Sequence, residues 1–103
     1  MSDVMLRLFT EEDDKHKGRL VYEWLLETGR ELGISGGSAF RAIAGFGHHG
    51  RMHEDTFFEL AGKLPVVVMF ATTANLADAL LARTKEEGLH LFYIRSVAET
   101  GTT

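Results

Sequence analysis

Alternating hydrophobic and polar positions open the chain, and a helical spacing follows them. Residues 4–9 are mostly apolar, with Val4, Leu6 and Leu8 on one face and Arg7 on the other, which predicts a strand. From Arg19 the apolar positions recur every three or four residues and predict an amphipathic helix that buries Val21, Trp24, Leu25, Thr28 and Leu32. Gly33 stands where a glycine ends such a helix.

A similar succession of elements follows in the rest of the chain. Three further strands are predicted by a small–large alternation, a wholly apolar run and a final alternation, in residues 38–46, 66–71 and 89–97. The last two strands flank a second amphipathic helix, which Thr72 or Thr73 caps and Gly88 ends. The order is therefore strand, helix, strand, strand, helix, strand.

This order predicts an α+β fold of the ferredoxin-like kind, a four-stranded antiparallel sheet with two helices on one face. We expect a single domain over residues 1–103, because the length suits one core. Residues 11–18 are interpreted as a polar connection, 45–55 as a long mobile loop rich in Gly and His, and 99–103 as a frayed tail.

The sheet face away from the two helices is predicted to be apolar. Its candidate residues are Phe9, Arg41, Met69, Phe92 and Ile94. Such a set is too apolar for an exposed surface, and it favours self-association through the sheets.

Composition and charge exclude several classes of protein. The 103 residues carry a net charge of −4 with no dense basic run, which argues against nucleic-acid binding. No apolar run approaches the ~20 residues of a membrane span, and the first residues lack the pattern of a signal peptide. Because the chain has no Cys, it has no disulfide and no thiolate nucleophile. We therefore expect a soluble, cytoplasmic domain that is not embedded in a membrane.

The loop after the second long strand holds the first candidate site. Glycines at Gly45 and Gly47 let the backbone approach a ligand, and successive amide groups can hold an anion. Arg51 adds a guanidinium that suits phosphate or carboxylate. The alternative is a flexible connection that needs its glycines for turns alone.

Two clusters of side chains suit a metal ion by residue type. His48, His49 and His53 offer imidazoles, but their spacing matches no established metal motif, and a solvated set of loop histidines is the alternative. The acidic run of residues 11–14 lacks the spacing of a calcium loop and is interpreted as a solvated turn. We find no catalytic motif, and so predict that the chain is not an enzyme.

Several segments together resemble a known family. They are Leu6-Arg7-Leu8-Phe9, Glu12-Asp13-Asp14, Gly18-Arg19-Leu20-Val21-Tyr22-Glu23, Gly33-Ile34-Ser35-Gly36-Gly37-Ser38-Ala39, Arg41-Ala42-Ile43-Ala44-Gly45-Phe46-Gly47, Arg51-Met52-His53 and Leu64-Pro65-Val66-Val67-Val68. Their joint spacing is similar to that of the PII-like proteins of the DUF190 family (domain of unknown function 190), over residues 4–97.

The resemblance implies a homotrimer like the PII signalling proteins and the CutA proteins, with sheets packed around the threefold axis. It implies a regulatory protein that binds a small effector, such as an adenine nucleotide, in clefts between subunits and signals to a protein partner through the 45–55 loop. The ligand-binding candidates are Gly45, Phe46, Gly47, Arg51, His53 and Arg41.

The chain departs from the PII pattern at two places. His49 stands where PII proteins have a glutamine, and residues 86–89 lack the lysine of their phosphate loop. A phosphate group would therefore rely on Arg51, Arg41 or Arg95. The competing hypothesis is a CutA-like metal-binding protein that uses His48, His49 and His53, and an enzyme with a small organic substrate is a third.

Overall fold

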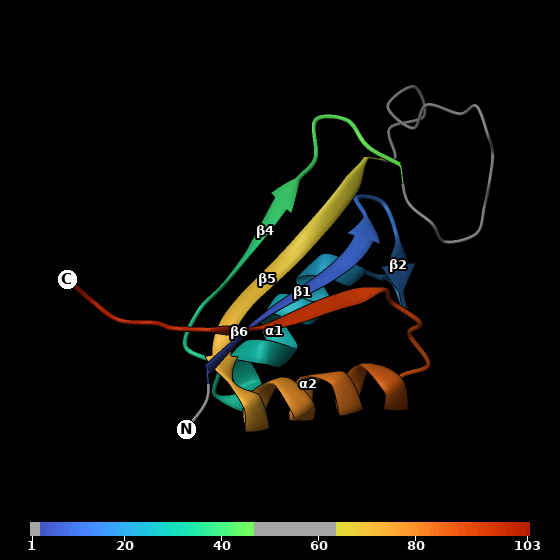
Figure 1. Ribbon diagram of the computed structural model, residues 1–103. Coiled ribbons are helices and arrows are strands. Elements are labelled where there is room, and N and C mark those ends of the chain that lie inside the picture. The colour runs from blue at the N-terminus through green and yellow to red at the C-terminus, as the bar shows by residue number, and fades with distance from the viewer. Residues whose placement is uncertain (1–2, 47–63) are drawn as a thin grey trace.

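The computed structural model describes residues 3–46 and 64–103. The main sheet has the order β4-β5-β1-β6 with antiparallel neighbours, and a short hairpin forms a second sheet. The bounds are β1 (Asp3–Glu11), β2 (Lys15–His16), β3 (Arg19–Leu20), α1 (Val21–Leu32), β4 (Gly37–Arg41), β5 (Pro65–Thr73), α2 (Ala74–Glu86) and β6 (Tyr93–Ala98). Both helices lie on one side of the sheet (Figure 1), so the predicted α+β, ferredoxin-like fold is confirmed.

The central strands show why the sequence pattern predicts this fold. Along β1 every second residue is buried, and β5 has the same alternation in its first six residues. The two strands pair so that Leu6 lies opposite Phe70 and Leu8 opposite Val68, which places all four side chains against the helices. This helix-covered face holds the core.

Both helices begin and end near the predicted positions. Gly33 follows α1 with φ 100°, a left-handed conformation that favours glycine, and Gly88 at φ 77° follows α2 after Glu87. Of the two threonines proposed as caps, Thr73 performs that role, since its hydroxyl accepts a hydrogen bond from the Leu76 backbone N–H at 3.2 Å.

The ring of Phe70 explains two glycines on the elements around it. A Cβ at Gly29 in α1 would lie 2.7 Å from a ring carbon of Phe70, and a Cβ at Gly37 in β4 would lie 2.5 Å from the same atom. A helix tolerates a glycine at a cost of about 1 kcal/mol. Gly29 is therefore present because the buried ring needs the space.

The strand predicted over residues 38–46 is shorter in the structure, and its side chains face the opposite sides of the sheet from those predicted. β4 ends at Arg41, and after the Ala42 N–H···O=C bond to Pro65 the chain leaves the sheet, with Ile43 95% exposed. Arg41 pairs with Val66 on the helix side, so its predicted place on the open face is wrong. Small residues face α1 here because the helix packs closely against β4, and Phe40 takes the open face instead.

A β-hairpin replaces part of the predicted polar connection. β2 and β3 pair His16 with Arg19, and the two residues between them, Lys17 and Gly18, have φ of 54° and 83°. Positive φ at both central positions matches the twist of a two-residue hairpin, a signal that the short sequence Lys-Gly carries weakly.

The hairpin is tied to the end of α2 by an ion pair. The carboxylate of Glu87 lies 2.8 Å from His16 Nε2 and 3.3 Å from Lys17 Nζ. Hydrogen bonds from His16 and then Lys17 lower the pKa of Glu87 below its ordinary value of 4.5. This pair joins residues 71 positions apart in the chain.

The second face of the sheet is apolar and has no described helix over it. Register and ring contacts place Phe9, Met69, Phe92 and Ile94 there as predicted: Ile94 and Met69 both flank Arg7, and the rings of Phe9 and Phe92 lie 5.4 Å apart. Phe40 is 51% exposed, Phe92 47% and Ile94 41%. We call the set Phe9, Phe40, Val67, Met69, Phe92 and Ile94 the open face.

The last strand and the C-terminal residues differ in part from the prediction. The last strand begins later than predicted, at Tyr93, because Leu89 and Leu91 pack against the core before the strand starts. Residues 99–103 run away from the body (Figure 1), although the Thr100 hydroxyl donates a hydrogen bond to Asp3. Most of the predicted 45–55 loop lies outside the described residues, and no described helix is long and apolar enough to span a membrane.

Candidate functional site

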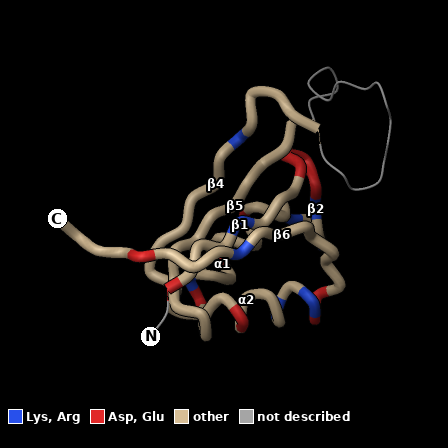
Figure 2. Tube along the Cα trace, viewed as in Figure 1, with Lys and Arg blue, Asp and Glu red and all other residues tan. Residues whose placement is uncertain are grey.

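Glu12, the residue after β1, contacts the end of β4 and the residue before β5. The Glu12 carboxylate Oε1 lies 2.8 Å from Arg41 Nε at the end of β4, and its backbone N–H donates to the Leu64 carbonyl at 2.9 Å. The backbone N–H of Ala42 donates to the Pro65 carbonyl at 2.8 Å. Figure 2 shows acidic residues after β1 and a basic position near the end of β4. Glu12 thus contacts both the end of β4 and the residue just before β5.

This end of the sheet carries those predicted ligand residues that the structure describes. Arg41 ends β4, a Cβ on Gly45 would lie an ordinary 3.7 Å from Pro65 Cγ, and Phe46 is 92% exposed. Arg41 and Gly45 are therefore brought to the same place around Pro65. The other candidates, Gly47, His48, His49, Arg51 and His53, lie outside the described residues.

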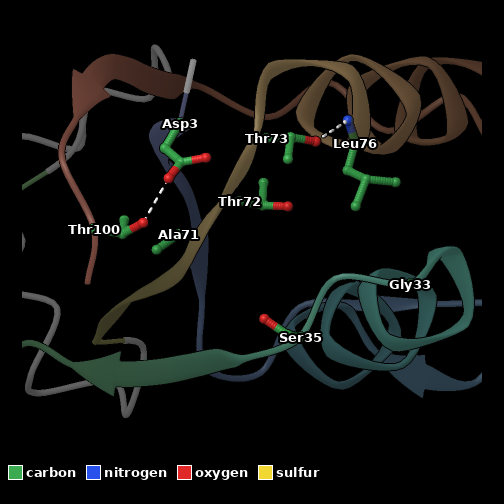
Figure 3. Close-up of a pocket in the computed structure, with 8 residues that line it drawn as sticks. All are labelled: Asp3, Gly33, Ser35, Ala71, Thr72, Thr73, Leu76 and Thr100. Atoms are coloured by element: carbon green, nitrogen blue, oxygen red, sulfur yellow. Dashed lines mark hydrogen bonds between the residues drawn. The ribbon is translucent and has the colours of Figure 1, made fainter. Parts of the chain in front are cut away.

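A hollow lies at the opposite end of the sheet (Figure 3). It has a volume of about 430 Å³ and is open to solvent. The start of β1, the turn after α1, the β5–α2 junction and the C-terminal segment line it with Asp3, Gly33, Ser35, Ala71, Thr72, Thr73, Leu76 and Thr100.

The chemistry of this hollow suits a neutral polar group. Ser35 and Thr72 present hydroxyls that both donate and accept, whereas the Thr73 hydroxyl is occupied as the cap of α2. Asp3, held by Thr100, adds a carboxylate that accepts hydrogen bonds and repels anions. The hollow can thus take a flat or compact group with N–H donors, such as a nucleobase, between these groups and Leu76.

Sequence reasoning missed these residues. The one available signal was the run of hydroxyls at positions 72 and 73, where a strand passes directly into a helix. It gave no indication that Ser35 and Thr100 would lie beside that run. The pairing of β4 with β5 brings Ser35 there, and the pairing of β1 with β5 and β6 brings Thr100 there.

The two regions are far apart within one protomer. They lie at opposite ends of β5, and the eight steps from Pro65 to Thr73 span about 26 Å at roughly 3.3 Å per residue. A ligand the size of a mononucleotide cannot reach from the hollow to Arg41 of the same chain.

The acidic run after β1 has a structural use. Carboxylate oxygens of Glu11, Asp13 and Asp14 lie within 4.8 Å of one another, but Asp14 already accepts hydrogen bonds from the Thr10 hydroxyl and the Glu11 N–H, at 3.0 and 3.2 Å. These bonds close the turn after β1, in agreement with its interpretation as a turn.

Sequence comparison identifies relatives of the chain. Residues 3–91 match the family DUF190, described as "Uncharacterized ACR, COG1993". A UPF0166 protein of Aquifex aeolicus is 44% identical over 64 residues, and one of Methanocaldococcus jannaschii is 33% identical over 64 residues. The match covers 62% of this chain in both cases, and it spans only 61% and 58% of the length of these relatives.

Structural comparison finds PII-like folds. CPII of Thiomonas intermedia K12, a nitrogen regulatory PII-like protein bound to ADP, AMP and bicarbonate, superposes with a TM-score of 0.67 at 15% identity, over 100% of this chain and 97% of that one. A putative PII-like signalling protein of Thermus thermophilus gives 0.57 at 22% identity, over 95% and 89%. At these identities the similarity establishes the PII-like fold.

Proposed function

The chain belongs to the DUF190 family, and on that premise we propose that it is a PII-like regulatory protein that binds a small ligand between identical subunits. The open face carries this proposal. Phe40, Phe92 and Ile94 are 41–51% exposed on a sheet face that no described element covers. A patch of this kind favours association, and copies of the chain are the partner that a PII-like fold suggests.

A homotrimer formed through this face creates clefts where one ligand meets two chains. The hollow and the Arg41 region lie about 26 Å apart in one protomer, at roughly 3.3 Å per residue of β5, so they can serve one ligand only across a subunit boundary. The hydroxyls of Ser35 and Thr72 then hold the neutral part of the ligand, and the other subunit supplies Arg41.

An adenine nucleotide suits a site with a neutral polar hollow and an arginine from a second subunit. Its base carries N–H donors for the hollow, and its phosphates suit the arginines of the loop end. The structural neighbour from Thiomonas intermedia was bound to ADP and AMP, which supports the same ligand class here. The expected contacts at the loop end remain Arg41, Gly45, Phe46, Gly47, Arg51 and His53.

Regulation follows from a shift in the population of conformations. A ligand that binds one arrangement of the 45–55 loop more tightly raises its population and so changes what a protein partner meets. The proposal assigns no chemical reaction to the chain.

Calorimetric titration with ATP, ADP, AMP and cyclic AMP tests the proposal. We expect saturable heat with at least one nucleotide, weakened by Arg51→Ala at the phosphates and by Ser35→Ala in the hollow. Glu23→Gln, on the exposed side of α1, is the control and leaves binding unchanged. Flat traces for all four nucleotides would exclude nucleotide sensing.

The alternative of metal binding depends on His48, His49 and His53, which lie outside the described residues. Metal analysis of protein purified without chelators, beside the triple His→Ala variant, decides it. A bound metal that the triple variant loses would favour the CutA-like function over nucleotide sensing.

A further inference from the structure

Arg41 is only partly engaged by its acidic neighbour. The contact with Glu12 uses Nε, at 2.8 Å, and the Arg41 side chain is 65% exposed. A guanidinium has five N–H donors in a planar fork, so with respect to the described residues its outer edge is open to a second, bidentate partner. A carboxylate or phosphate group of a ligand is such a partner.

The contact between Glu12 and Arg41 is a weak ion pair. The Glu12 Oε1 atom is buried and, among the described residues, has no hydrogen bond of acceptable geometry, although it lies close to the charge of Arg41. Pairs of this kind are strong when two parallel N–H···O bonds form, and this pair forms none. An incoming anion that makes both bonds therefore competes well with Glu12.

The ion pair can also open without disrupting the sheet. Two backbone hydrogen bonds hold the neighbouring strand ends, Glu12 N–H to the Leu64 carbonyl and Ala42 N–H to the Pro65 carbonyl. Neither bond uses the side chain of Glu12 or of Arg41. Exchange of the partner of Arg41 thus costs one ion pair in which Arg41 is 65% exposed and Glu12 27% exposed.

We propose that Arg41 is an anion site, that the Glu12 carboxylate occupies it when no ligand is bound, and that a carboxylate or phosphate group displaces Glu12. This inference deepens the proposed function and rests on it for the identity of the natural ligand. Glu12 acts as a built-in competitor that sets the ligand affinity, and its displacement removes its contact with the end of β4 while the backbone bond to Leu64 remains.

An isosteric substitution of Glu12 tests whether its carboxylate competes with the ligand for Arg41 or only holds the end of β4 in place. Glu12→Gln keeps the backbone bond to Leu64 and removes the competing charge. Because an ion pair with one largely exposed partner is worth up to about one kcal/mol, ADP affinity should rise about two- to fivefold. Arg41→Gln should lower it by about tenfold. In the Arg41→Gln background the effect of Glu12→Gln should vanish.

Matched probes and controls identify the group that Arg41 binds. Adenosine, which has no anionic group, should bind equally to all these variants, and Glu11→Gln, with the same change of charge one residue away, should change ADP affinity by less than about twofold. Inorganic phosphate and succinate distinguish phosphate from carboxylate. The NMR signal of the Arg41 Nε–H group should shift with the anion that displaces Glu12.

The outcomes separate this inference from the proposed function. If ADP binds the parent protein but Glu12→Gln leaves its affinity unchanged or lowers it, the competitor role is wrong and nucleotide binding stands. If ADP and adenosine fail to bind but phosphate or succinate shifts the Arg41 signal, more strongly in Glu12→Gln, the anion site stands without the nucleotide. If no anion shifts that signal, the anion site is excluded.

Discussion

The two faces of the main sheet are built from alternate residues of the same strands, but only one face is covered within the described part of the protomer. On the helix-covered face Leu6 and Val68 are fully buried and Phe70 is 2% exposed, whereas on the open face Phe40 is 51% exposed and Ile94 41%. Both faces are apolar, so composition does not distinguish them. The β-α-β connections place both helices on one side, and no described element covers the other side.

The two faces therefore contribute differently to stability. Packing on the covered face stabilises the single chain, whereas under the proposed function the apolar area of the open face contributes only in the assembly. Arg7 lies in the middle of the open face between Met69 and Ile94, so an interface there must also satisfy a guanidinium.

The largest effect is expected from truncation on the covered face. Phe70→Ala removes a buried ring from between α1 and β4, and should lower the free energy of unfolding by about 3–5 kcal/mol. Denaturant unfolding followed by circular dichroism measures the change. A loss below about 1 kcal/mol would mean that the ring does not fill the core as described.

Filling the space beside that ring should cost less. Gly37→Ala places a Cβ 2.5 Å from a ring carbon of Phe70 and 3.3 Å from Leu26, and should destabilise the chain by about 1–3 kcal/mol. Gly36→Ala, where nothing lies within 4 Å of the added Cβ, is the control. Combination with Phe70→Leu should cost less than the sum of the two single changes, since the smaller side chain makes room.

The same substitution on the open face should affect association more than folding. Phe40→Ala should change the free energy of unfolding of the protomer by under about 1 kcal/mol, and should weaken assembly about tenfold. Sedimentation over a range of protein concentrations reports the second effect. If the parent protein stays monomeric at every concentration, the proposed interface and the clefts between subunits are excluded.

The smallest effect is expected at the ion pair that fastens the hairpin to the end of α2. Because His16 and Lys17 lower the pKa of Glu87, its ionised form stabilises the folded state above the ordinary value of 4.5, and this contribution is lost as the pH falls through the lowered pKa. The thermal midpoints of the parent and of Glu87→Gln should differ at pH 7, and the difference should shrink as the pH falls below 4.5. A constant difference across this range would contradict the assignment.

The covered face was largely predictable from the sequence, and the candidate site was predictable only in part. Period-two alternation marks Leu6 and Leu8 as core, and Gly33 ends α1 as expected. The face of Arg41 was not predictable, because a one-residue choice of register exchanges the two sides of β4 and its small residues give no strong preference. The requirement for glycine at position 29 was not predictable either, because it comes from the ring of Phe70, 41 positions away in the chain.

Signals between neighbours along the chain were enough to predict the four strands of the main sheet, the two helices, the apolar character of both sheet faces and the glycines that end the helices. Which residues share a site depended on the folded chain. Asp3, Ser35, Thr72 and Thr100 line one hollow, and Glu12 meets Arg41 at the other end. Strand pairing sets such meetings over long separations, and local periodicity carries no information about them.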